Sequence, residues 1–344
     1  MSEEFDKVAE FAQKYVADRP VVVLGTGATI PYGLPSMPAL ARALVERIKI
    51  DEGEKNYETW KKFVAALEKT NDLERALHDA ELSDDLLSQV VEETWRLNNE
   101  KDLQALLGFA ADSSTLQIAR LFEHLLRTAN PTVSVVTTNY DRLAEYAADV
   151  AQACAFTGFS GGHIQHFLRN DRPNTPGRNV NVWKVHGSLD WFEKGTGDLL
   201  GLPLQAEIPK GCRPLIVTPG SSKYREVYND PFRTILGRAD DTLKTARSYL
   251  CIGYGFNDEH VQPVLNRRVH ENSIPIVVVT KELSAAGRRI LLERPCGKFL
   301  ILEEENTSTK AYYPGRPGGV SIPGCSLWNL DKFLDMLLAE GEEH

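Results

Sequence analysis

Residues 21–29 read VVVLGTGAT, so four apolar residues lead directly into a turn with two glycines. Two later segments also place polar residues directly after an apolar run. Residues 133–141 read VSVVTTNYD and residues 181–188 read NVWKVHGS. In an open α/β sheet, ligands bind at the carboxyl ends of the strands. We therefore expect the glycine turn, Asn139 with Asp141, and His186 to surround one crevice, which would suit a nucleotide.

The wider pattern predicts the fold class. Candidate strands are residues 21–24, 133–137, 180–185, 215–218, 249–253, 276–280 and 299–302. Several of these runs are apolar throughout, which is typical of a sheet covered on both faces. Segments of helical periodicity lie between them. This alternation predicts an α/β fold with a doubly wound, Rossmann-like parallel sheet.

Two regions depart from this rhythm. Residues 51–112 are rich in Glu, Lys, Leu and Ala without a good strand, so they are interpreted as a helical insertion. Residues 304–344 are interpreted as a mobile loop and a C-terminal helix. The loop is assigned to residues 304–325 because residues 312–319 read YYPGRPGG, and the helix that follows is amphipathic. Residues 1–50 and 113–303 then form the Rossmann domain.

Composition limits the classes of function. The chain has 344 residues and a net charge of -9, which argues against direct nucleic-acid binding. No apolar run approaches the ~20 residues of a membrane span, and we expect a cytoplasmic protein. The five cysteines never form a CxxC pair, so neither a structural zinc module nor a disulfide framework is expected.

The glycine turn belongs to a longer pattern. The run GTGATIPYGLP, residues 25–35, resembles the sirtuin pattern G-A-G-x-S-x-x-x-G-I-P at the same spacing. Thr138-Asn139-Tyr140-Asp141 is similar to the sirtuin Q-N-x-D segment, and His186-Gly187 to its H-G segment. Residues 250–256, LCIGYGF, stand where sirtuins carry a strand ending in G-T-S. The order agrees, and the likeness spans about residues 20 to 300.

Further segments are similar to one branch, the bacterial sirtuin-like proteins of antiphage defence, above all the subunit that works with a HerA-type ATPase. They are residues 159–161 (FSG), 184–191 (KVHGSLDW), 218–224 (TPGSSKY) and 253–258 (GYGFND). The resemblance implies hydrolysis of NAD+ to ADP-ribose and nicotinamide, which depletes NAD+ during infection. Two departures from the deacetylases agree with this branch: Ser36-Met37-Pro38 replaces their D-F-R, and their four-cysteine zinc module is missing.

Each candidate site residue has an expected role. Asn139 is neutral and can orient a water or a ribose hydroxyl, and His186 can act as a general base. By the resemblance, Asp141 hydrogen-bonds the nicotinamide carboxamide. The remaining candidates bind the rest of NAD+. The backbone N–H groups of Gly25, Thr26, Gly27, Ala28 and Thr29 would cradle the pyrophosphate, and Gly253, Tyr254, Gly255 and Phe256 would lie near the adenosine ribose, with Thr280 a weaker candidate.

Simpler interpretations compete with these roles. Asn139 and Asp141 are also typical caps for a helix that begins near Arg142. A histidine before a glycine is often an ordinary core or turn residue. The pair His163 and His166 is too small a set of ligands to indicate a metal site. Residues 257–260, NDEH, are most simply the capped start of a helix, and Trp191 is a candidate pocket wall.

Three functions remain open on the sequence alone. The leading hypothesis is an NAD+ glycohydrolase, with NAD+ as substrate and no metal. The second is a non-catalytic binder of NAD+ or ADP-ribose that acts as a sensor or scaffold, and the third is an NAD-dependent deacylase. A toxic NADase must be restrained in uninfected cells, so we expect a homo-oligomer or a HerA-type ATPase partner docked on the helical insertion or the C-terminal helix.

Overall fold

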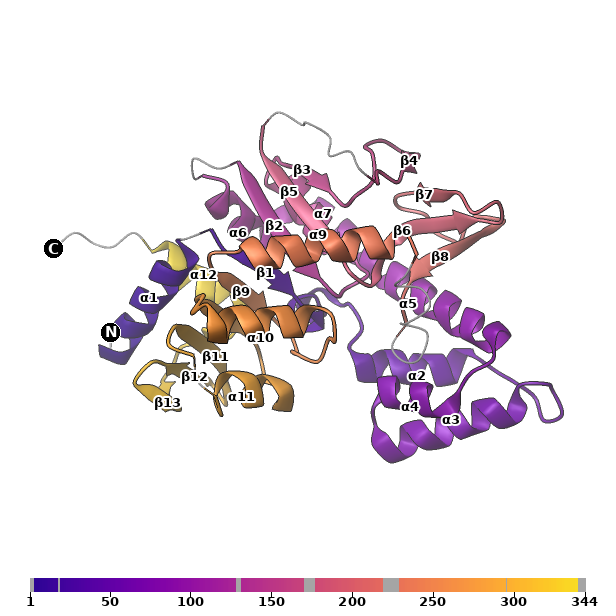
Figure 1. Ribbon diagram of the computed structural model, residues 1–344, viewed down its shortest axis with the longest axis horizontal. Coiled ribbons are helices and arrows are strands. Elements are labelled where there is room, and N and C mark those ends of the chain that lie inside the picture. Colours follow the sequence, from indigo (N-terminus) through magenta and orange to yellow (C-terminus); the bar gives the residue numbers. More distant parts are fainter. Residues whose placement is uncertain are drawn as a thin grey trace.

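The computed structural model describes residues 3–17, 19–127, 131–169, 177–218, 229–294 and 296–339. Most of the TPGSSKY segment (residues 219–224) and the last five residues lie outside this part. In the described part, a nine-stranded sheet runs in the order β13-β12-β11-β10-β9-β1-β2-β5-β3 (Figure 1). The seven strands from β11 to β3 in that order pair in parallel, and β12 and β13 add to the edge in antiparallel fashion.

The strands of the main sheet are short and mostly buried. Their bounds are β1 (Val21–Leu24), β2 (Thr132–Thr137), β3 (Cys154–Phe156), β5 (Asn179–Lys184), β9 (Tyr249–Ile252), β10 (Ile276–Val279), β11 (Phe299–Glu305), β12 (Ser308–Tyr313) and β13 (Arg316–Ile322). Successive side chains of a strand point to opposite faces. Val22 and Leu24 therefore enter one core, and Val21 and Val23 enter the other.

Helices cover both faces of this sheet. One face carries α1 (Glu3–Val16), α6 (Gln117–Leu125), α7 (Leu143–Val150) and α12 (Leu330–Leu338). The other carries α9 (Phe232–Thr245), α10 (Val261–Glu271) and α11 (Ala285–Leu291), which lie in front of the sheet in Figure 1. The strands of the parallel sheet thus have apolar partners on both faces, as such a sheet needs. This arrangement confirms the predicted doubly wound α/β fold.

A group of helices stands apart from the sheet. It contains α2 (Met37–Arg47), α3 (Tyr57–Thr70), α4 (Leu73–Ala80) and the first half of α5 (Asp84–Ala111), packed around Trp60 and Phe63 (Figure 1). Three of these helices fall within residues 51–112, where helices are predicted. Helix α2 joins them because its Leu40 and Leu44 are buried in the same apolar cluster. We call these four elements the helical group.

A smaller antiparallel sheet lies beside the middle of α5. Its order is β4-β7-β6-β8, with β4 (Gln165–His166), β6 (Gly187–Lys194), β7 (Leu199–Gly201) and β8 (Cys212–Ile216). The buried Trp95 of α5 donates its indole N–H to the backbone oxygen of Leu189 at 2.8 Å. Residues 215–218 are interpreted as a strand of the main sheet, but Leu215 and Ile216 end β8 of this second sheet instead, and residues 217 and 218 lie beyond it.

The interpretation of residues 304–325 as a loop is wrong. Strands β12 and β13 occupy most of this segment and extend the main sheet beyond β11. Glycine and proline correctly indicate a turn, but the turn is confined to the neighbourhood of Gly315, whose φ is 90°. The β12 residues Thr309, Ala311 and Tyr313 are buried, which stabilises the hairpin. The amphipathic helix expected after it is present as α12.

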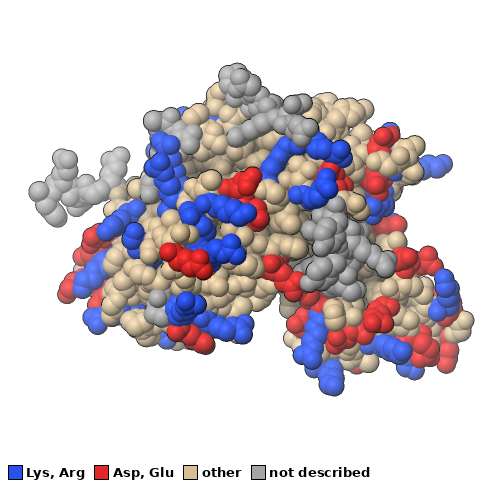
Figure 2. All heavy atoms as spheres, in the orientation of Figure 1, with Lys and Arg blue, Asp and Glu red and all other residues tan. Residues whose placement is uncertain are grey.

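Charges are mixed on the face of the molecule that Figure 2 shows. Figure 2 shows Lys and Arg side chains interspersed with Asp and Glu, both over the helices in front of the main sheet and over the helical group. All five cysteines are free. In the part of the chain that the structure describes, no helix has both the length and the apolar character that crossing a bilayer requires.

Candidate functional site

Four neighbouring strands of the main sheet end at one pocket. Strands β9, β1, β2 and β5 are adjacent, and the residues just after each of them line a pocket of about 190 Å³. The sequence-predicted residues in its wall are Gly25, Thr26, Thr29, Asn139, Asp141, His186, Tyr254 and Gly255. The structure thus brings together the two predicted catalytic residues and most of the predicted binding residues.

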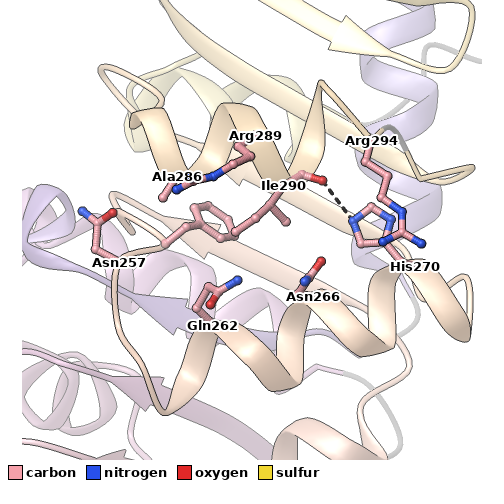
Figure 3. A pocket seen from close by; sticks show the side chains of 9 residues that line it. Asn257, Gln262, Asn266, His270, Ala286, Arg289, Ile290 and Arg294 are labelled. Carbon is pink, nitrogen blue, oxygen red and sulfur yellow. Dashed lines mark hydrogen bonds between the residues drawn. The ribbon is translucent and has the colours of Figure 1, made fainter.

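The other predicted residues line two further pockets. Gly27, Ala28 and Gly253 face a pocket of about 430 Å³ on the other side of the glycine turn, together with Thr280 at the end of β10. Phe256 faces a third pocket, between α10 and α11 (Figure 3). Two exposed arginines, Arg289 and Arg294, border this third pocket, but neither predicted catalytic residue does.

The glycine turn packs against the turn that follows β9. A Cβ on Gly25 would lie 2.4 Å from the backbone oxygen of Gly253, so only glycine fits there. The Gly27 N–H donates to the same oxygen at 3.0 Å. The N–H groups of Gly25, Ala28 and Thr29 also donate to backbone oxygens.

This packing corrects one expectation. We expected the glycines to leave room for a pyrophosphate and the whole turn to offer its N–H groups. In the structure, the room beside Gly25 and Gly27 holds the backbone of residues 253 and 254, and four of the five N–H groups are already engaged. The Thr29 hydroxyl already donates to the Thr26 backbone oxygen at 3.2 Å. Among the described residues, the Thr26 N–H and hydroxyl are therefore the donors of the turn that remain for a phosphate.

Asn139 is held in a single orientation. Its amide nitrogen donates to the Gly25 backbone oxygen at 3.0 Å and to Thr29 Oγ1 at 3.4 Å. Because a carbonyl oxygen only accepts hydrogen bonds, the amide nitrogen and not Oδ1 must face Gly25. The side chain is 7% exposed. Oδ1 is therefore the atom that can accept a hydrogen bond from a water or a ribose hydroxyl.

Asp141 combines a capping contact with a place in the pocket wall. Its Oδ1 accepts the Leu143 N–H at 3.2 Å at the start of α7, so the simpler interpretation as a cap holds for this residue. Burial raises the pKa of Asp141 to about 6, although the buried Lys184 ammonium opposes the rise. Lys184 also donates to the Asp141 backbone oxygen and pairs with Glu145 at 2.8 Å.

The raised pKa of Asp141 predicts a pH-dependent effect of the Asp141→Asn substitution. The folded-state pKa lies above the ordinary value, so the ionised carboxylate destabilises the fold as the pH rises through 6. A shift of this size corresponds to about 3 kcal/mol. In urea unfolding, Asp141→Asn should be more stable than the wild type at pH 8, and the gain should vanish near pH 4.

The matched control for that experiment is Asp51→Asn, because Asp51 is exposed. It should change the unfolding free energy equally little at both pH values. A gain for Asp141→Asn that does not depend on pH would contradict the assignment, because it would have to come from packing and not from the buried charge.

His186 occupies the short connection between β5 and β6. The following Gly187 has a φ of 88°, and a Cβ there would lie 2.1 Å from the Leu215 backbone oxygen, so this connection is tightly packed. His186 Nε2 lies 2.8 Å from Asp258 Oδ2. The remaining oxygen of Asp258 accepts the N–H groups of His260 and Val261 at 3.0 and 2.8 Å, as predicted for the start of α10.

Asp258 is therefore a site residue that sequence reasoning missed. It lines the same pocket as His186 and is 8% exposed. Burial alone would raise its pKa, but the facing imidazole and the two backbone N–H groups outweigh this effect and hold the pKa of Asp258 below its ordinary value. The sequence signalled only the cap, since nothing in it places residue 258 beside residue 186.

The helical group supplies the opposite wall of the pocket. Met37 and Leu40 come from α2, Glu74 from α4 and Asn98 from α5. Sequence reasoning did not find these residues, because their helical spacing indicates only packing. The expected pocket wall Trp191 is not among the lining residues. It stacks on Phe159 in the core, with ring centroids 5.0 Å apart.

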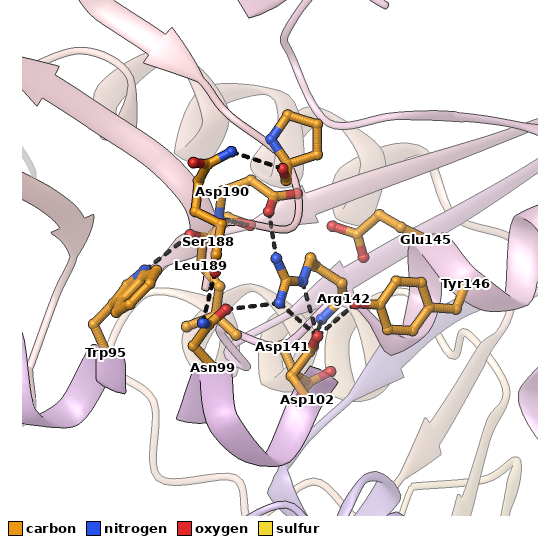
Figure 4. A network of polar contacts seen from close by, with 12 residues as sticks. Trp95, Asn99, Asp102, Asp141, Arg142, Glu145, Tyr146, Ser188, Leu189 and Asp190 are labelled. Atoms are coloured by element: carbon orange, nitrogen blue, oxygen red, sulfur yellow. Dashed lines mark hydrogen bonds and ion pairs between the residues drawn. The ribbon is translucent and has the colours of Figure 1, made fainter. Parts of the chain in front are cut away.

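A buried polar network lies behind the loop that carries Asn139 and Asp141 (Figure 4). The Arg142 guanidinium contacts Asp102 at 2.7 Å and Asp190 at 2.8 Å, and it donates to Asn99 Oδ1 at 2.8 Å. The Arg142 backbone N–H also donates to Asp102, at 2.7 Å. The network thus fixes the site loop to α5 on one side and to β6 on the other.

In the described ranges, no three His, Cys, Asp or Glu side chains are grouped so that they could hold a metal ion. The titratable groups of the pocket, among them Asp141, His186 and Asp258, lie instead around a space lined both by amides and hydroxyls and by apolar side chains such as Leu34 and Met37. This arrangement suits proton transfer and hydrogen bonding to a polar organic ligand.

Comparisons with known proteins agree in part with the resemblance seen in the sequence. The model of a family described as a SIR2-like domain matches residues 133–293. The matched segment contains Asn139, Asp141, His186 and Asp258 but not the glycine turn. No curated protein matches the chain.

Solved structures of Sir2 proteins are similar over most of the chain. One, from a study of the mechanism and regulation of Sir2 enzymes, is 14% identical, covers 98% of each chain and has a TM-score of 0.45. A Sir2 homologue in complex with NAD is 15% identical and covers 88% of each chain, with a TM-score of 0.43. A mutant Sir2 homologue in complex with 2'-O-acetyl ADP ribose is 14% identical and has a TM-score of 0.44. The match covers 99% of this chain and 100% of that chain.

Proposed function

We propose that this chain is an NAD+ glycohydrolase that cleaves NAD+ to ADP-ribose and nicotinamide. The observation that carries the proposal is that Asn139, Asp141 and His186 line one pocket at the ends of adjacent parallel strands. The SIR2-like match over residues 133–293, which includes all three, supports an NAD-related activity.

The two pockets beside the glycine turn suggest how a dinucleotide lies. The catalytic pocket would take the nicotinamide and its ribose, with Asp141 facing the carboxamide. The pocket lined by Gly253 and Thr280 would take the adenosine half. The pyrophosphate then crosses the turn between them, near the N–H and hydroxyl of Thr26.

The chemical step needs little beyond these residues. The bond between the ribose C1' and the nicotinamide nitrogen breaks, and its electron pair neutralises the pyridinium. A water held by Asn139 Oδ1 adds its oxygen to the oxocarbenium-like C1', and His186 accepts the proton that the water loses. The low exposure of Asn139 and Asp141 limits the number of waters that can reach the reacting carbon.

The setting of the reaction is a further part of the proposal. The segments similar to sirtuin-like defence proteins indicate depletion of NAD+ during phage infection. Such an activity requires control, so we propose a homo-oligomer or a HerA-type ATPase partner. The helical group is the natural place for this control, because it forms one wall of the catalytic pocket.

Nicotinamide release from NAD+ tests the proposal directly. Product is measured by chromatography with the purified full chain, alone and with a candidate ATPase. Asn139→Ala and His186→Ala should each lower the rate by at least about 100-fold, since positioned acid–base groups typically contribute that much. His163→Ala, at an exposed position, is the matched control and should retain the wild-type rate.

The same measurements separate the alternatives. Full turnover by both site variants would show that the residues are wrongly assigned. Tight binding of NAD+ in calorimetry without product, even with the partner, would favour a sensor or scaffold. NAD+ consumption that depends on an acylated peptide would favour a deacylase.

A further inference from the structure

The contact between His186 and Asp258 joins two turns that lie far apart in the sequence. His186 follows β5, and Asp258 begins the turn into α10, yet Nε2 and Oδ2 are 2.8 Å apart. The side chains are 12% and 6% exposed, respectively. Both atoms are sealed from solvent, and neither makes a hydrogen bond of good geometry with any described group, the facing atom included.

This isolation determines where a proton must be. A buried ring nitrogen and a buried carboxylate oxygen without other partners are each costly to leave unsatisfied. At 2.8 Å the two atoms are within hydrogen-bond distance, and a proton on Nε2 that a small rotation of the ring directs at Oδ2 would satisfy both atoms at once. A proton on Nδ1 instead would place the lone pair of Nε2 against an ionised oxygen.

The carboxylate is itself fixed in place. Its Oδ1 accepts two backbone N–H groups at 3.0 and 2.8 Å, so the carboxylate cannot rotate without breaking the start of α10. The two N–H groups and the imidazole also favour the ionised form. Asp258 is thus a rigid acceptor aimed at one particular nitrogen of His186.

We propose that Asp258 is a positioning residue that holds neutral His186 in the Nε2–H tautomer and leaves Nδ1 as the basic atom that faces the pocket. The base chemistry rests on the proposed function, whereas the tautomer does not. When Nδ1 accepts the proton of the attacking water, the imidazolium that forms has both N–H groups occupied, and Asp258 stabilises its charge. The other titratable groups of the pocket wall are Asp141, Glu74, Tyr140 and Tyr254.

Asp258→Asn distinguishes this role from simple capping. The asparagine Oδ1 can still accept the His260 and Val261 N–H groups, so the start of α10 is preserved. Its amide NH2 then faces His186, and Nε2 must accept a hydrogen bond. The proton moves to Nδ1, and the pocket-facing atom becomes a donor. If Asp258 only capped α10, the Asp258→Asn substitution would leave the tautomer of His186 unchanged.

The decisive measurement is long-range proton–nitrogen NMR on the full chain labelled with 15N-histidine, with the His186 signals identified by their loss in His186→Ala. Neutral His186 should carry its proton on Nε2 in the wild type and on Nδ1 in Asp258→Asn. A wild-type ring protonated on Nδ1 would overturn the proposal without any variant. An unchanged tautomer in a folded Asp258→Asn would also overturn it.

A kinetic experiment separates this inference from the proposed function. In Ser-His-Asp hydrolases the equivalent exchange of carboxylate for amide lowers kcat by about 10⁴ while the geometry is kept. Here Asp258→Asn should lower kcat for nicotinamide release by roughly 10² to 10⁴ with KM nearly unchanged. The exposed neighbour in Glu259→Gln should keep the wild-type kcat.

The two experiments fail in different ways. If the wild type releases no nicotinamide while the NMR tautomers are as stated, the proposed function fails and the positioning role stands. If the wild type is active and Asp258→Asn keeps its full kcat, the positioning role fails and the glycohydrolase stands.

Discussion

Replacing Arg142 by methionine is expected to destabilise the folded chain by about 3–5 kcal/mol, because it leaves a buried carboxylate without its partner. Arg142 is 2% exposed, and its main partner Asp102 is fully buried. Asp190 would lose its ion-pair partner as well. The free energy of unfolding in urea, measured at pH 7, checks this expectation directly.

Two further variants separate the buried charge from other effects. Arg96→Met removes an arginine that is 47% exposed and pairs with Glu92 and Glu93, so its effect should stay below about 1 kcal/mol. Asp102→Asn, added to Arg142→Met, neutralises the stranded carboxylate and should recover part of the loss. An Arg142→Met chain within 1 kcal/mol of the wild type would show that the network contributes little to stability.

The Arg142 network also holds the loop of the candidate site in place. Arg142 comes directly after Asp141, and its backbone N–H is held by Asp102 of α5. The substitution keeps this N–H but removes the guanidinium contacts with Asp102, Asn99 and Asp190, which loosens the loop that carries Asn139 and Asp141 against α5 and β6. Arg142→Met should therefore weaken ADP-ribose binding under conditions in which the variant is still folded, although Arg142 does not line the pocket.

The fold could be predicted from the sequence because its evidence is local. An apolar strand followed at once by Gly25, Asn139 or His186 places each of these residues at the end of a strand. In a parallel sheet, the carboxyl ends of neighbouring strands lie on the same edge. The strand order was not needed to expect one crevice. The order itself puts β9, β1, β2 and β5 side by side.

Contacts between distant side chains could not be predicted in this way. Asp258 looks like a helix cap in the sequence and is one, but its second oxygen meets His186 only after two turns of the fold pack together. Asp102 lies in α5 and Arg142 directly precedes α7, 40 positions later. In each case the sequence shows a polar residue of an ordinary kind, and the fold supplies its partner.

For the hairpin of β12 and β13, the sequence suggested the wrong local structure. Glycine and proline in residues 314–319 suggest a loop when they are counted as composition. The strands are stabilised by pairing with β11 and by burial of alternate residues, and composition does not register either effect. To interpret residues 304–325 correctly, the alternation of apolar and polar residues in the strands would have to count for more than the number of glycines.

Gly253→Ala is expected to lower the free energy of unfolding by an amount similar to that for Arg142→Met. Gly253 has a φ of 56°, and an added Cβ would lie 2.2 Å from both Ala28 N and Gly27 C. The left-handed conformation costs about 1–2 kcal/mol for a residue with a Cβ, and overpacking against rigid backbone costs about 1–3 kcal/mol more. We expect a loss of about 2–5 kcal/mol in urea unfolding, with the glycine turn pushed away from the turn after β9.

Gly324→Ala provides the matched control for this contact. Gly324 has a φ of 70°, but a Cβ there meets nothing within 4 Å, so only the conformational cost of about 1–2 kcal/mol should appear. Calorimetry with ADP-ribose adds a second comparison. Gly253→Ala should weaken binding by at least about 10-fold, because the turn it displaces lies between the two pockets, whereas Gly324→Ala should bind as the wild type does. Equal losses of stability and equal affinities in the two variants would mean that the close approach of the two turns does not hold the nucleotide site together.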